Sequence, residues 1–429
     1  MSIWNNLYIG ISGLNAHGNA ISVVGDNIAN VSTVGFKASR AGFSNVMGGM
    51  AGAARLGGGV HMDGTQVSFG QGILQQTGGT LDMAVSGRGF FAVNGNHNGT
   101  PGNYYTRDGR FNIDTGGFIV NPEGLRLQGY MFDPTGVQGQ QVGDLQLGAL
   151  QSQPLATTAA NLSLNLDATE PIAPAWDPAD PEATSTFATS TTVYDSLGNG
   201  HKVDMYFRNG GAGAWDWHAM VDGAELNGGG AGPGVPTEIG SGSLTFDTSG
   251  HLDTETTAGG TADFLGAEPG QVIGFDFGDS ITTDGGTGTA GTTQYAGAST
   301  VNASTQNGFG FGSLVDMVVS ENGTIEGLFS NGQRRAVARV ALATFTAEEG
   351  LARESGQLFR ETTASGQALV DAAATGSRGS VFAGNLEASN VDLTNELVTL
   401  IAYQRAFQAN VKTVQTADEM LTEVANLKR

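Results

Sequence analysis

The residues that could carry out catalysis or bind metals are scattered through this 429-residue chain and follow no catalytic spacing. None of the six histidines stands in a His-Glu-x-x-His motif, which places two zinc ligands on one helix face. The chain has no Gly-Lys pair, which excludes a Walker-type phosphate loop, and no Gly-x-Ser-x-Gly turn for a serine nucleophile. It has no cysteine, which excludes thiol catalysis, thiolate metal sites and disulfides. The sequence therefore predicts no catalytic residue, no metal site and no cofactor, and we expect that the protein is not an enzyme. The histidines are His17, His61, His97, His201, His218 and His251.

Three local patterns allow a chemical interpretation, but a structural interpretation fits each of them better. The stretch 308–312 (GFGFG) looks like a glycine-rich nucleotide loop, but neither a helix pattern nor an acidic partner follows it, which favours turn glycines. Asp108 and Asp114, each followed closely by glycine, lack the alternating ligand series of a calcium loop and indicate turns. Trp215 and Trp217 alternate on one face of a predicted strand. They form either a sugar-binding platform or, as we expect, part of a core or of an interdomain contact.

The strongest pattern is a long helix predicted from about Asn390 to Leu427. It opens on Ser389, and a serine followed three residues later by a carboxylate, Asp392, is a helix-start signal. No glycine or proline interrupts the run that follows. Its apolar residues recur at spacings of three, four and seven, the narrow seam of a coiled coil, so this helix needs a partner. The seam positions are Leu393, Leu397, Leu400, Phe407, Val411, Val414, Leu421, Val424 and Leu427, with Gln404 and Asp418 at two polar positions between them.

The first 31 residues predict a second amphipathic helix with the same spacing, and this helix is the expected partner. Its glycines, such as Gly10 and Gly13, each cost about 1 kcal/mol of helix stability relative to alanine, so we expect stabilisation from outside the monomer. The alternative is an ordinary helical hairpin that closes one globule. The apolar positions are Ile3, Leu7, Ile11, Leu14, Ile21, Val24, Ile28 and Val31. The predicted self-assembly interface consists of Leu7, Ile11, Leu14, Ile21, Ile28, Leu393, Leu397, Leu400, Phe407, Val411, Val414 and Leu421.

Two long motifs stand at opposite ends of the chain. The first includes Gly13 and Leu14 and continues from 26 to 37 (DNIANVSTVGFK), and the second runs from 386 to 393 (LEASNVDL) and from 404 to 410 (QRAFQAN). In this order and spacing they resemble the terminal segments of bacterial flagellar axial proteins, the family of rod and hook subunits. Ser32 departs from the family pattern, which often has asparagine there. The motif residues that carry the resemblance are Asn27, Asn30, Thr33, Gly35, Phe36, Lys37, Ser389, Asn390, Asp392, Gln404 and Arg405.

Between the motifs the sequence predicts β structure in nested domains. The 68 glycines and only 14% charged residues suit many short strands and turns, and 429 residues exceed one compact domain. The predicted fold is mainly β with paired N- and C-terminal helices, an inner coiled-coil layer plus two outer β domains. We expect 1–40 and 386–429 to form the inner helical domain and 41–79 a linker, with an extended hairpin around Val67 to Gln76. The inner β domain is expected from 80–145 and 303–385, with Val337 to Phe345 as its central strand, and the outer β domain from 146–302.

The net charge of −22 is concentrated in the middle of the chain. From Leu127 to Gln333 the sequence has 24 acidic residues and two basic ones, which predicts a solvent-facing surface and argues against binding to nucleic acid. No apolar run reaches 18 residues, so we expect no segment inserted in a membrane. The start of the chain lacks a basic region followed by an apolar core, so we expect no cleaved signal peptide.

The resemblance implies a structural function. Rod and hook subunits polymerise head-to-tail, and the 146–302 insert and the predicted hairpin of Val193 to Phe207 are similar to hook subunits in particular. The hook is a curved, flexible tube that acts as a universal joint and transmits torque from the rod to the filament. The implied partners are other copies of the chain, the distal rod and hook-filament junction proteins, the hook cap and the flagellar type III export apparatus. The implied location is the extracellular hook. A distal rod subunit and, less favoured, a secreted β-rich binding protein are the alternatives.

Overall fold

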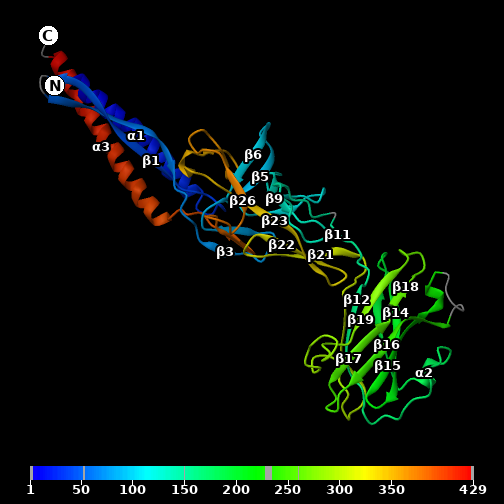
Figure 1. Ribbon diagram of the computed structural model, residues 1–429. Helices are drawn as coiled ribbons and strands as arrows, with labels where there is room; N and C mark the ends of the chain where they lie inside the picture. The colour runs from blue at the N-terminus through cyan, green and yellow to red at the C-terminus, as the bar shows by residue number, and fades with distance from the viewer. Residues whose placement is uncertain (1–2, 52–53, 149, 228–233, 259, 427–429) are drawn as a thin grey trace. The chain divides into compact units, whose positions relative to one another are not determined.

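The computed structural model describes residues 3–51, 54–148, 150–227, 234–258 and 260–426 (Figure 1). Within these ranges the chain consists mainly of β-strands, with a long helix near each end, α1 (Ile3–Ala29) and α3 (Leu393–Asn426). The predicted fold class is therefore confirmed. The chain forms two compact units. The first comprises Met1–Leu150, Val315–Leu328 and Arg334–Arg429, and the second comprises Gln151–Leu314 and Phe329–Gln333. The further division of the first unit into a helical layer and an inner β domain stays a prediction.

The two long helices of the first unit pack against each other in antiparallel orientation (Figure 1). A Cβ atom added at Gly10 would lie 2.7 Å from the side chain of Val414, and one added at Gly13 would lie 2.6 Å from that of Asn410. The glycines that lower the helix propensity of α1 therefore let α3 approach closely. This is the pairing of the two chain ends that the sequence predicts.

A long β-hairpin packs on α1 as a third layer of the helical region. Its strands are β1 (Ser39–Ala51) and β2 (Ala54–Val67), and Val60 of β2 donates its backbone N–H to the hydroxyl of Ser12 on α1, at 3.2 Å. The stretch predicted as a linker, 41–79, is therefore largely structured. The hairpin expected around Val67 to Gln76 was misplaced, because Val67 ends β2 and the next strand is β3 (Leu74–Gln76). Glycine, alanine and methionine dominate β1 and β2 and hide the alternation that marks a strand.

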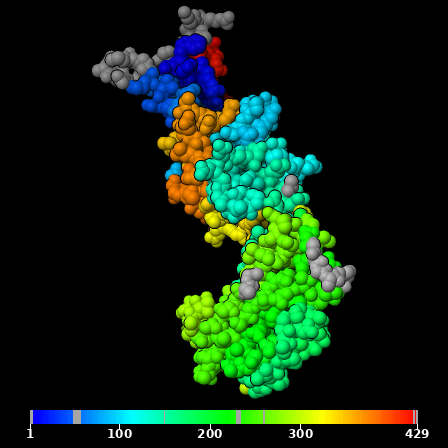
Figure 2. Space-filling view, turned by 45° about the vertical axis from the view of Figure 1, so that its right-hand side comes forward, coloured from blue at the N-terminus to red at the C-terminus, as the bar shows by residue number. Residues whose placement is uncertain are grey.

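The remaining part of the first unit is a β-sheet made from both halves of the chain. Strand β23 lies at its centre, as predicted, and pairs with β22, β9, β5 and β26. Figure 2 shows the cyan and orange segments of this sheet packed side by side, as the pairing of β6 with β25 requires. The strands of this sheet in the first unit include β5 (Phe90–His97), β6 (Thr100–Thr106), β7 (Asn112–Ile113), β8 (Ile119–Val120), β9 (Arg126–Met131), β10 (Gly143–Asp144), β22 (Thr324–Phe329), β23 (Arg334–Thr344), β24 (Ala352–Arg353), β25 (Leu358–Arg360) and β26 (Leu369–Ala372), with the short helix η2 (Glu348–Gly350). Two separate two-stranded sheets accompany it: β4 (Met83–Ser86) pairs with β27 (Ser380–Ala383), and β3 pairs with β28 (Asn385–Glu387).

The second unit contains a five-stranded and a four-stranded sheet around one core. Trp215 and Trp217 of β15 are fully buried in this core, so the interpretation as a sugar-binding platform is wrong. Glycines at 308 and 310 flank Phe309, which forms a bridge with Leu155 as part of a turn region. The elements are β11 (Gln151–Ser152), β12 (Ala159–Asn165), α2 (Pro181–Thr184), β13 (Phe187–Tyr194), β14 (Gly200–Gly211), β15 (Ala214–Asp222), η1 (Gly223–Glu225), β16 (Pro236–Phe246), β17 (Leu252–Ala258), β18 (Gly260–Ala262), β19 (Gln271–Asp276) and β20 (Thr300–Gln306). β11 pairs with the first residues of β21 (Gly312–Val319), and the residues of β21 from Val315 onward belong to the first unit.

Candidate assembly interface and its buried joint

Nine of the twelve predicted self-assembly residues are half-buried within one chain. Phe407 and Val414 of α3 lie against α1 at Gly18 and Gly10. The fully buried side chains of the pair are small, as at Ala20, so the larger ones stay half-buried. The half-buried predicted residues are Leu7, Leu14, Ile21 and Ile28 on α1 and Leu400, Phe407, Val411, Val414 and Leu421 on α3. Of the other seam positions, Val24 is buried and Val31 half-buried, while the side chains of Ile3 and Val424 and all of Leu427 lie outside the described residues.

A second set of apolar residues on the same helices faces solvent. Three predicted members, Ile11, Leu393 and Leu397, belong to this set and not to the seam. The sequence pattern missed the others, although they follow helical spacing from the predicted members. Trp4 is 69% exposed and Val398 63% exposed, which is unusual for such large apolar side chains. We define the α1 stripe as Trp4, Tyr8 and Ile11, and the α3 stripe as Leu393, Leu397, Val398 and Ile401.

The two polar positions predicted inside the seam lie elsewhere. Gln404 and Asp418 are exposed on α3, as is the motif residue Arg405, so none of the three occupies the seam. The spacing of seven that predicts these two positions applies to a supercoiled helix with large residues in its seam. Among the described side chains of α3, the fully buried one is instead small, Ala417. An aromatic cluster takes the middle of the helical region instead: His17 lies 5.5 Å from Phe43 of β1 and 5.9 Å from Tyr403 of α3, between ring centroids.

The motif residue Asn27 ties the end of α1 to both neighbours. Its side-chain oxygen accepts from the backbone N–H of Ser39 at 2.9 Å, and its side-chain nitrogen donates to the Ser39 carbonyl at 2.7 Å. The same nitrogen donates to Glu396 of α3 at 3.1 Å. One buried asparagine therefore fixes the distance between α1, β1 and α3, and an aliphatic residue would leave backbone groups unpaired. Next to it, Thr33 donates to the side chain of Asn30 at 3.0 Å and shapes the turn after α1.

Asn390 makes the corresponding contacts at the start of α3. Its side-chain oxygen accepts from Ala38 N at 2.8 Å, and its nitrogen donates to the carbonyls of Ser68 and Gly70 at 2.8 and 3.0 Å. Asp392, two residues later, accepts from the backbone N–H of Thr394 at 2.9 Å and is the helix cap.

The helix start predicted at Asn390 was therefore placed too early. Ser389 does not cap α3 and instead accepts from Val391 N at 3.3 Å, within the approach to the helix. Asp392 takes the capping position, and α3 begins at Leu393. The carboxylate of the predicted start signal is therefore the cap itself, and the serine lies before the helix.

Gly35 and Phe36 anchor the first motif on the β-sheet. Gly35 has φ of +69°, and a Cβ atom there would lie 2.6 Å from the backbone nitrogen of Asp108, so no other residue fits without displacement. Its N–H donates to the carbonyl of Glu387 at 2.8 Å. Phe36 is fully buried, and the guanidinium of Arg353 lies 4.5 Å from the centre of its ring. The family motif is therefore a packing and hydrogen-bonding element.

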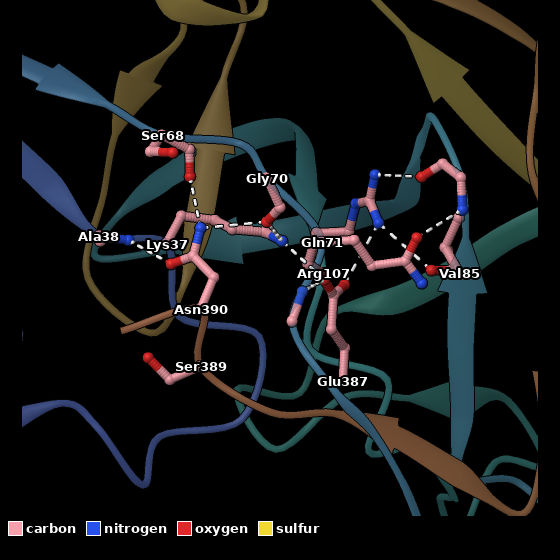
Figure 3. A network of polar contacts seen from close by, with 12 residues as sticks. Lys37, Ala38, Ser68, Gly70, Gln71, Val85, Arg107, Glu387, Ser389 and Asn390 are labelled. Carbon is pink, nitrogen blue, oxygen red and sulfur yellow. Dashed lines mark hydrogen bonds and ion pairs between the residues drawn. The ribbon is translucent and has the colours of Figure 1, made fainter. Parts of the chain in front are cut away.

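A buried ion cluster stands at the centre of this region (Figure 3). Glu387 accepts from Lys37 Nζ at 2.7 Å through one carboxylate oxygen and from Arg107 Nη1 at 3.2 Å through the other. The three side chains are at most 3% exposed. Backbone groups complete the cluster: Lys37 donates to the Gly70 carbonyl at 2.8 Å, and Arg107 donates to the Gly87 carbonyl at 2.8 Å.

The cluster places two cations on one carboxylate in a site without water access. Burial lowers the pKa of Lys37 and also that of Arg107, while the charge of Glu387 acts on both in the opposite direction. The carboxylate of Glu387 therefore offsets the desolvation cost of burying both cations. We call the contacts of Asn27, Gly35, Phe36, Lys37, Arg107, Glu387 and Asn390 the joint, because they connect the helical region to the β-sheet. Lys37 was predicted as a motif residue, whereas Arg107 and Glu387 were missed as its partners.

Within the described ranges of the chain, neither a group of metal-binding side chains nor a helix fit to cross a membrane occurs. Among the residues that the structure describes, no three or more His, Asp or Glu side chains are grouped to hold a metal ion. In the same part of the chain, no helix is both long and apolar enough to cross a membrane. Asp108 pairs with Arg110 at 2.6 Å and Asp114 accepts from Phe118 N at 2.8 Å, so both predicted turn aspartates have local protein partners.

Four family models match the chain in sequence order. They are the flagella basal body rod protein at 7–37, the flagellar hook protein FlgE/F/G D1 domain at 84–152, the flagellar basal body protein FlaE D2 domain at 165–309, and the flagellar basal body rod FlgEFG protein C-terminal segment at 383–427. The first and last contain the residues of the joint that lie near the helices, and the second contains Arg107.

Curated relatives match over nearly the whole length. The flagellar hook protein FlgE of Escherichia coli is 34% identical over 427 residues, which cover 97% of this chain and 98% of that protein. The chain belongs to the flagellar hook protein family. Hook proteins of Salmonella typhimurium and Treponema pallidum are 33% and 32% identical, covering 97% and 99% of this chain and 98% and 99% of their own lengths. The crystal structure of Helicobacter pylori flagellar hook protein FlgE2 aligns with 72% of this chain and 98% of its own, with a TM-score of 0.48 and 16% identity. As a member of this family the chain is a structural subunit of the flagellar hook.

Proposed function

We propose that this hook subunit polymerises through its helical region, so that successive copies make head-to-tail contacts and build a curved, flexible tube. The observation that carries the proposal is the pair of exposed apolar stripes on helices whose own seam is already closed within one chain. Burial of apolar surface is favourable by about 25 cal/mol per Å2, so these stripes favour contact with other copies. Contacts between unlike surfaces do not close on themselves and generate a helical filament.

The joint supports a mechanical part of this proposal. A hook that acts as a universal joint transmits torque from the rod to the filament, and load must then pass between the helical region and the β-sheet of each subunit. Lys37 comes from the N-terminal motif, Glu387 from the C-terminal motif and Arg107 from the sheet, so all three chain segments meet at one carboxylate. We propose that this arrangement keeps the helical region attached to the sheet while contacts between copies lengthen and shorten.

We propose a different role for the second unit, namely that it faces solvent and tunes the curvature of the tube. Between 151 and 314 the sequence has 19 acidic and two basic residues. Packing so many like charges inside a polymer would be unfavourable, and their repulsion extends only about 8 Å at physiological salt. It acts between neighbouring outer domains but not across a tube. No catalytic role is proposed for this unit or for the chain.

The remaining partners follow from the family. We propose contacts with the distal rod and hook-filament junction proteins at the two ends of the hook, assembly under the hook cap, and export through the flagellar type III apparatus. The extracellular hook is then the place of assembly. The distal rod subunit is the second candidate, but the match of 165–309 to the D2 domain and the full-length hook relatives favour the hook.

Assembly of the purified full-length protein tests the proposal. Raising the salt concentration should produce hook-like tubes in negative-stain electron micrographs. Expression in a strain that lacks its own hook protein should restore hooks, while expression in a strain that lacks the distal rod protein should not. Failure to polymerise, or rescue of the rod strain alone, would contradict the proposed function.

A further inference from the structure

A groove of about 370 Å3 lies between α1 and the β1–β2 hairpin. Tyr8 and Ile11 of the α1 stripe form part of one wall, and Val46 and Val60 form part of the other. Tyr8 is 66% exposed, and Ile11 and Val46 are exposed as well. The groove therefore presents apolar side chains to solvent beside polar ones such as Ser12 and His61.

The α3 stripe has the form of a surface that enters such a groove. Leu393, Leu397 and Ile401 recur every four residues, and Val398 lies beside them on the same face. Helices that bind in grooves use apolar anchors at this spacing. No part of the described chain buries these four side chains, each of which stays exposed.

The centres of the groove and of the α3 stripe carry few charges. α1 contains no Asp, Glu, Lys or Arg from Ile3 to Gly25, and α3 contains none from Leu397 to Gln404, although Glu396 lies between Leu393 and Leu397 and His61 lines the hairpin side of the groove. Contact through Leu397, Val398 and Ile401 therefore brings no Asp, Glu, Lys or Arg of these two stretches into the apolar contact, which limits its desolvation penalty. Asn15 and Asn19 on the groove wall supply hydrogen-bonding groups beside the apolar contact.

The two surfaces stand at different heights along the helical pair. The groove lies beside Ile11, near the level where Gly10 faces Val414, whereas the α3 stripe lies where Asn27 bonds Glu396. From Ile11 to Asn27 the rise of 1.5 Å per residue gives a separation of about 25 Å. The stripe of one chain is therefore too far away to fill the groove of the same chain.

We infer that the α3 stripe of one copy docks in the groove between α1 and the β1–β2 hairpin of a second copy. This inference rests on the proposed polymerisation and names the two surfaces that meet. The two surfaces differ and lie at different heights along the helical pair. A chain that has bound a neighbour through one of them therefore still has the other one free. The contact repeats without closing and continues along the polymer.

The absence of cysteine makes an engineered disulfide a direct test. The variant carries Asn15→Cys on the groove wall and Val398→Cys on the stripe, both at exposed positions. Mild oxidation of assembled full-length protein should give a ladder of covalent dimers, trimers and longer products on a denaturing gel. The matched control carries Asn15→Cys with Thr422→Cys, which is exposed on α3 outside the stripe, and it should stay monomeric.

Electron micrographs of the same samples separate the two proposals. Absence of tubes from the unmodified chain contradicts the proposed function. Tubes of the Asn15→Cys, Val398→Cys variant that do not cross-link, or cross-linking in the control alone, overturn the docking inference and leave polymerisation intact.

A charge substitution gives a second readout that does not depend on disulfide geometry. Val398→Asp should raise the critical concentration for assembly about tenfold or more, because an unpaired carboxylate is unfavourable in an apolar contact. Gln415→Asp places the same charge on an exposed part of α3 beyond the stripe and should leave it within about twofold. Equal critical concentrations of the two variants would overturn the inference.

Discussion

The helical region and the second unit bury their apolar side chains in different ways. In the second unit, large residues such as Trp217 and Phe264 have no solvent exposure, and two sheets enclose them. In the helical pair, the fully buried side chains are small, as at Ala20, while Trp4 and Val398 face solvent. The second unit therefore completes its core within one chain, whereas the helical region leaves apolar surface for another copy.

Two optical signals follow the two regions separately. Three of the four tryptophans, Trp176, Trp215 and Trp217, lie in the second unit. Both long helices, α1 and α3, lie in the first unit. Tryptophan fluorescence therefore reports mainly on the second unit, and the helical circular dichroism signal reports on the first. Substitutions in one region should change one signal and leave the other in place.

Glu387→Gln should have the largest effect, because it leaves the cations of Lys37 and Arg107 buried without a counter-charge. Removing one partner of a buried ion pair costs about 3–5 kcal/mol, so the circular dichroism transition should shift by that amount and the tubes should be lost. The second unit, followed by tryptophan fluorescence, should unfold at the same denaturant concentration as in the unmodified protein. The matched control is Glu354→Gln, which breaks the surface pair with Arg360 and should cost at most about 1 kcal/mol. Similar losses in both variants would contradict the role given to the joint.

Trp217→Ala should have the reverse pattern. It removes a fully buried ring from the core of the second unit and should cost about 3–5 kcal/mol in the fluorescence transition. The circular dichroism transition and the formation of tubes should persist, since the helical region is unchanged. A variant that loses tubes while its second unit stays folded would show that assembly depends on the core of this unit.

The sequence predicts the helices well because their periodicity is local. The heptad-like spacing identified α1 and α3 and their pairing, but it did not separate the closed seam from stripes such as Leu393 to Ile401. The β1–β2 hairpin was missed because its glycines, alanines and methionines show no alternation. The contact of Lys37 with Glu387 joins residues 350 positions apart, and no local pattern encodes such a pair.

Gly35→Ala tests the fit of the first motif on the sheet. The residue would have to keep φ of +69° with a Cβ atom 2.6 Å from Asp108 N, so we expect a loss of about 1–3 kcal/mol in the circular dichroism transition. Gly78→Ala is the control, because Gly78 has φ of +79° and no neighbouring atom within 4 Å of the added Cβ. Its smaller loss measures the backbone strain alone. Equal losses would show that the close approach at Gly35 has no energetic role.

The smallest expected effect is a pH dependence in the second unit. Burial raises the pKa of Glu255 from 4.5 to about 7. Between these values the unfolded chain loses the proton while the folded chain keeps it, so stability falls as pH rises and levels off above about 7. The midpoint of unfolding followed by fluorescence should therefore lie at a lower denaturant concentration at pH 8 than at pH 5. In Glu255→Gln the difference in unfolding midpoint between pH 5 and pH 8 should shrink. An unchanged difference would show that other titratable groups cause the pH dependence.

If the helical region assembles the tube and the second unit only tunes its curvature, a protein without most of the second unit should still polymerise. Ser152 pairs with Gly312 in an antiparallel ladder, so the chain leaves and returns at adjacent positions, and a short Gly-Ser linker can replace 153–311. The measurement is electron microscopy of the deleted protein under the assembly conditions of the full chain. We expect tubes that have lost their regular curvature. Absence of any polymer, from a protein whose helical circular dichroism is intact, would contradict this expectation.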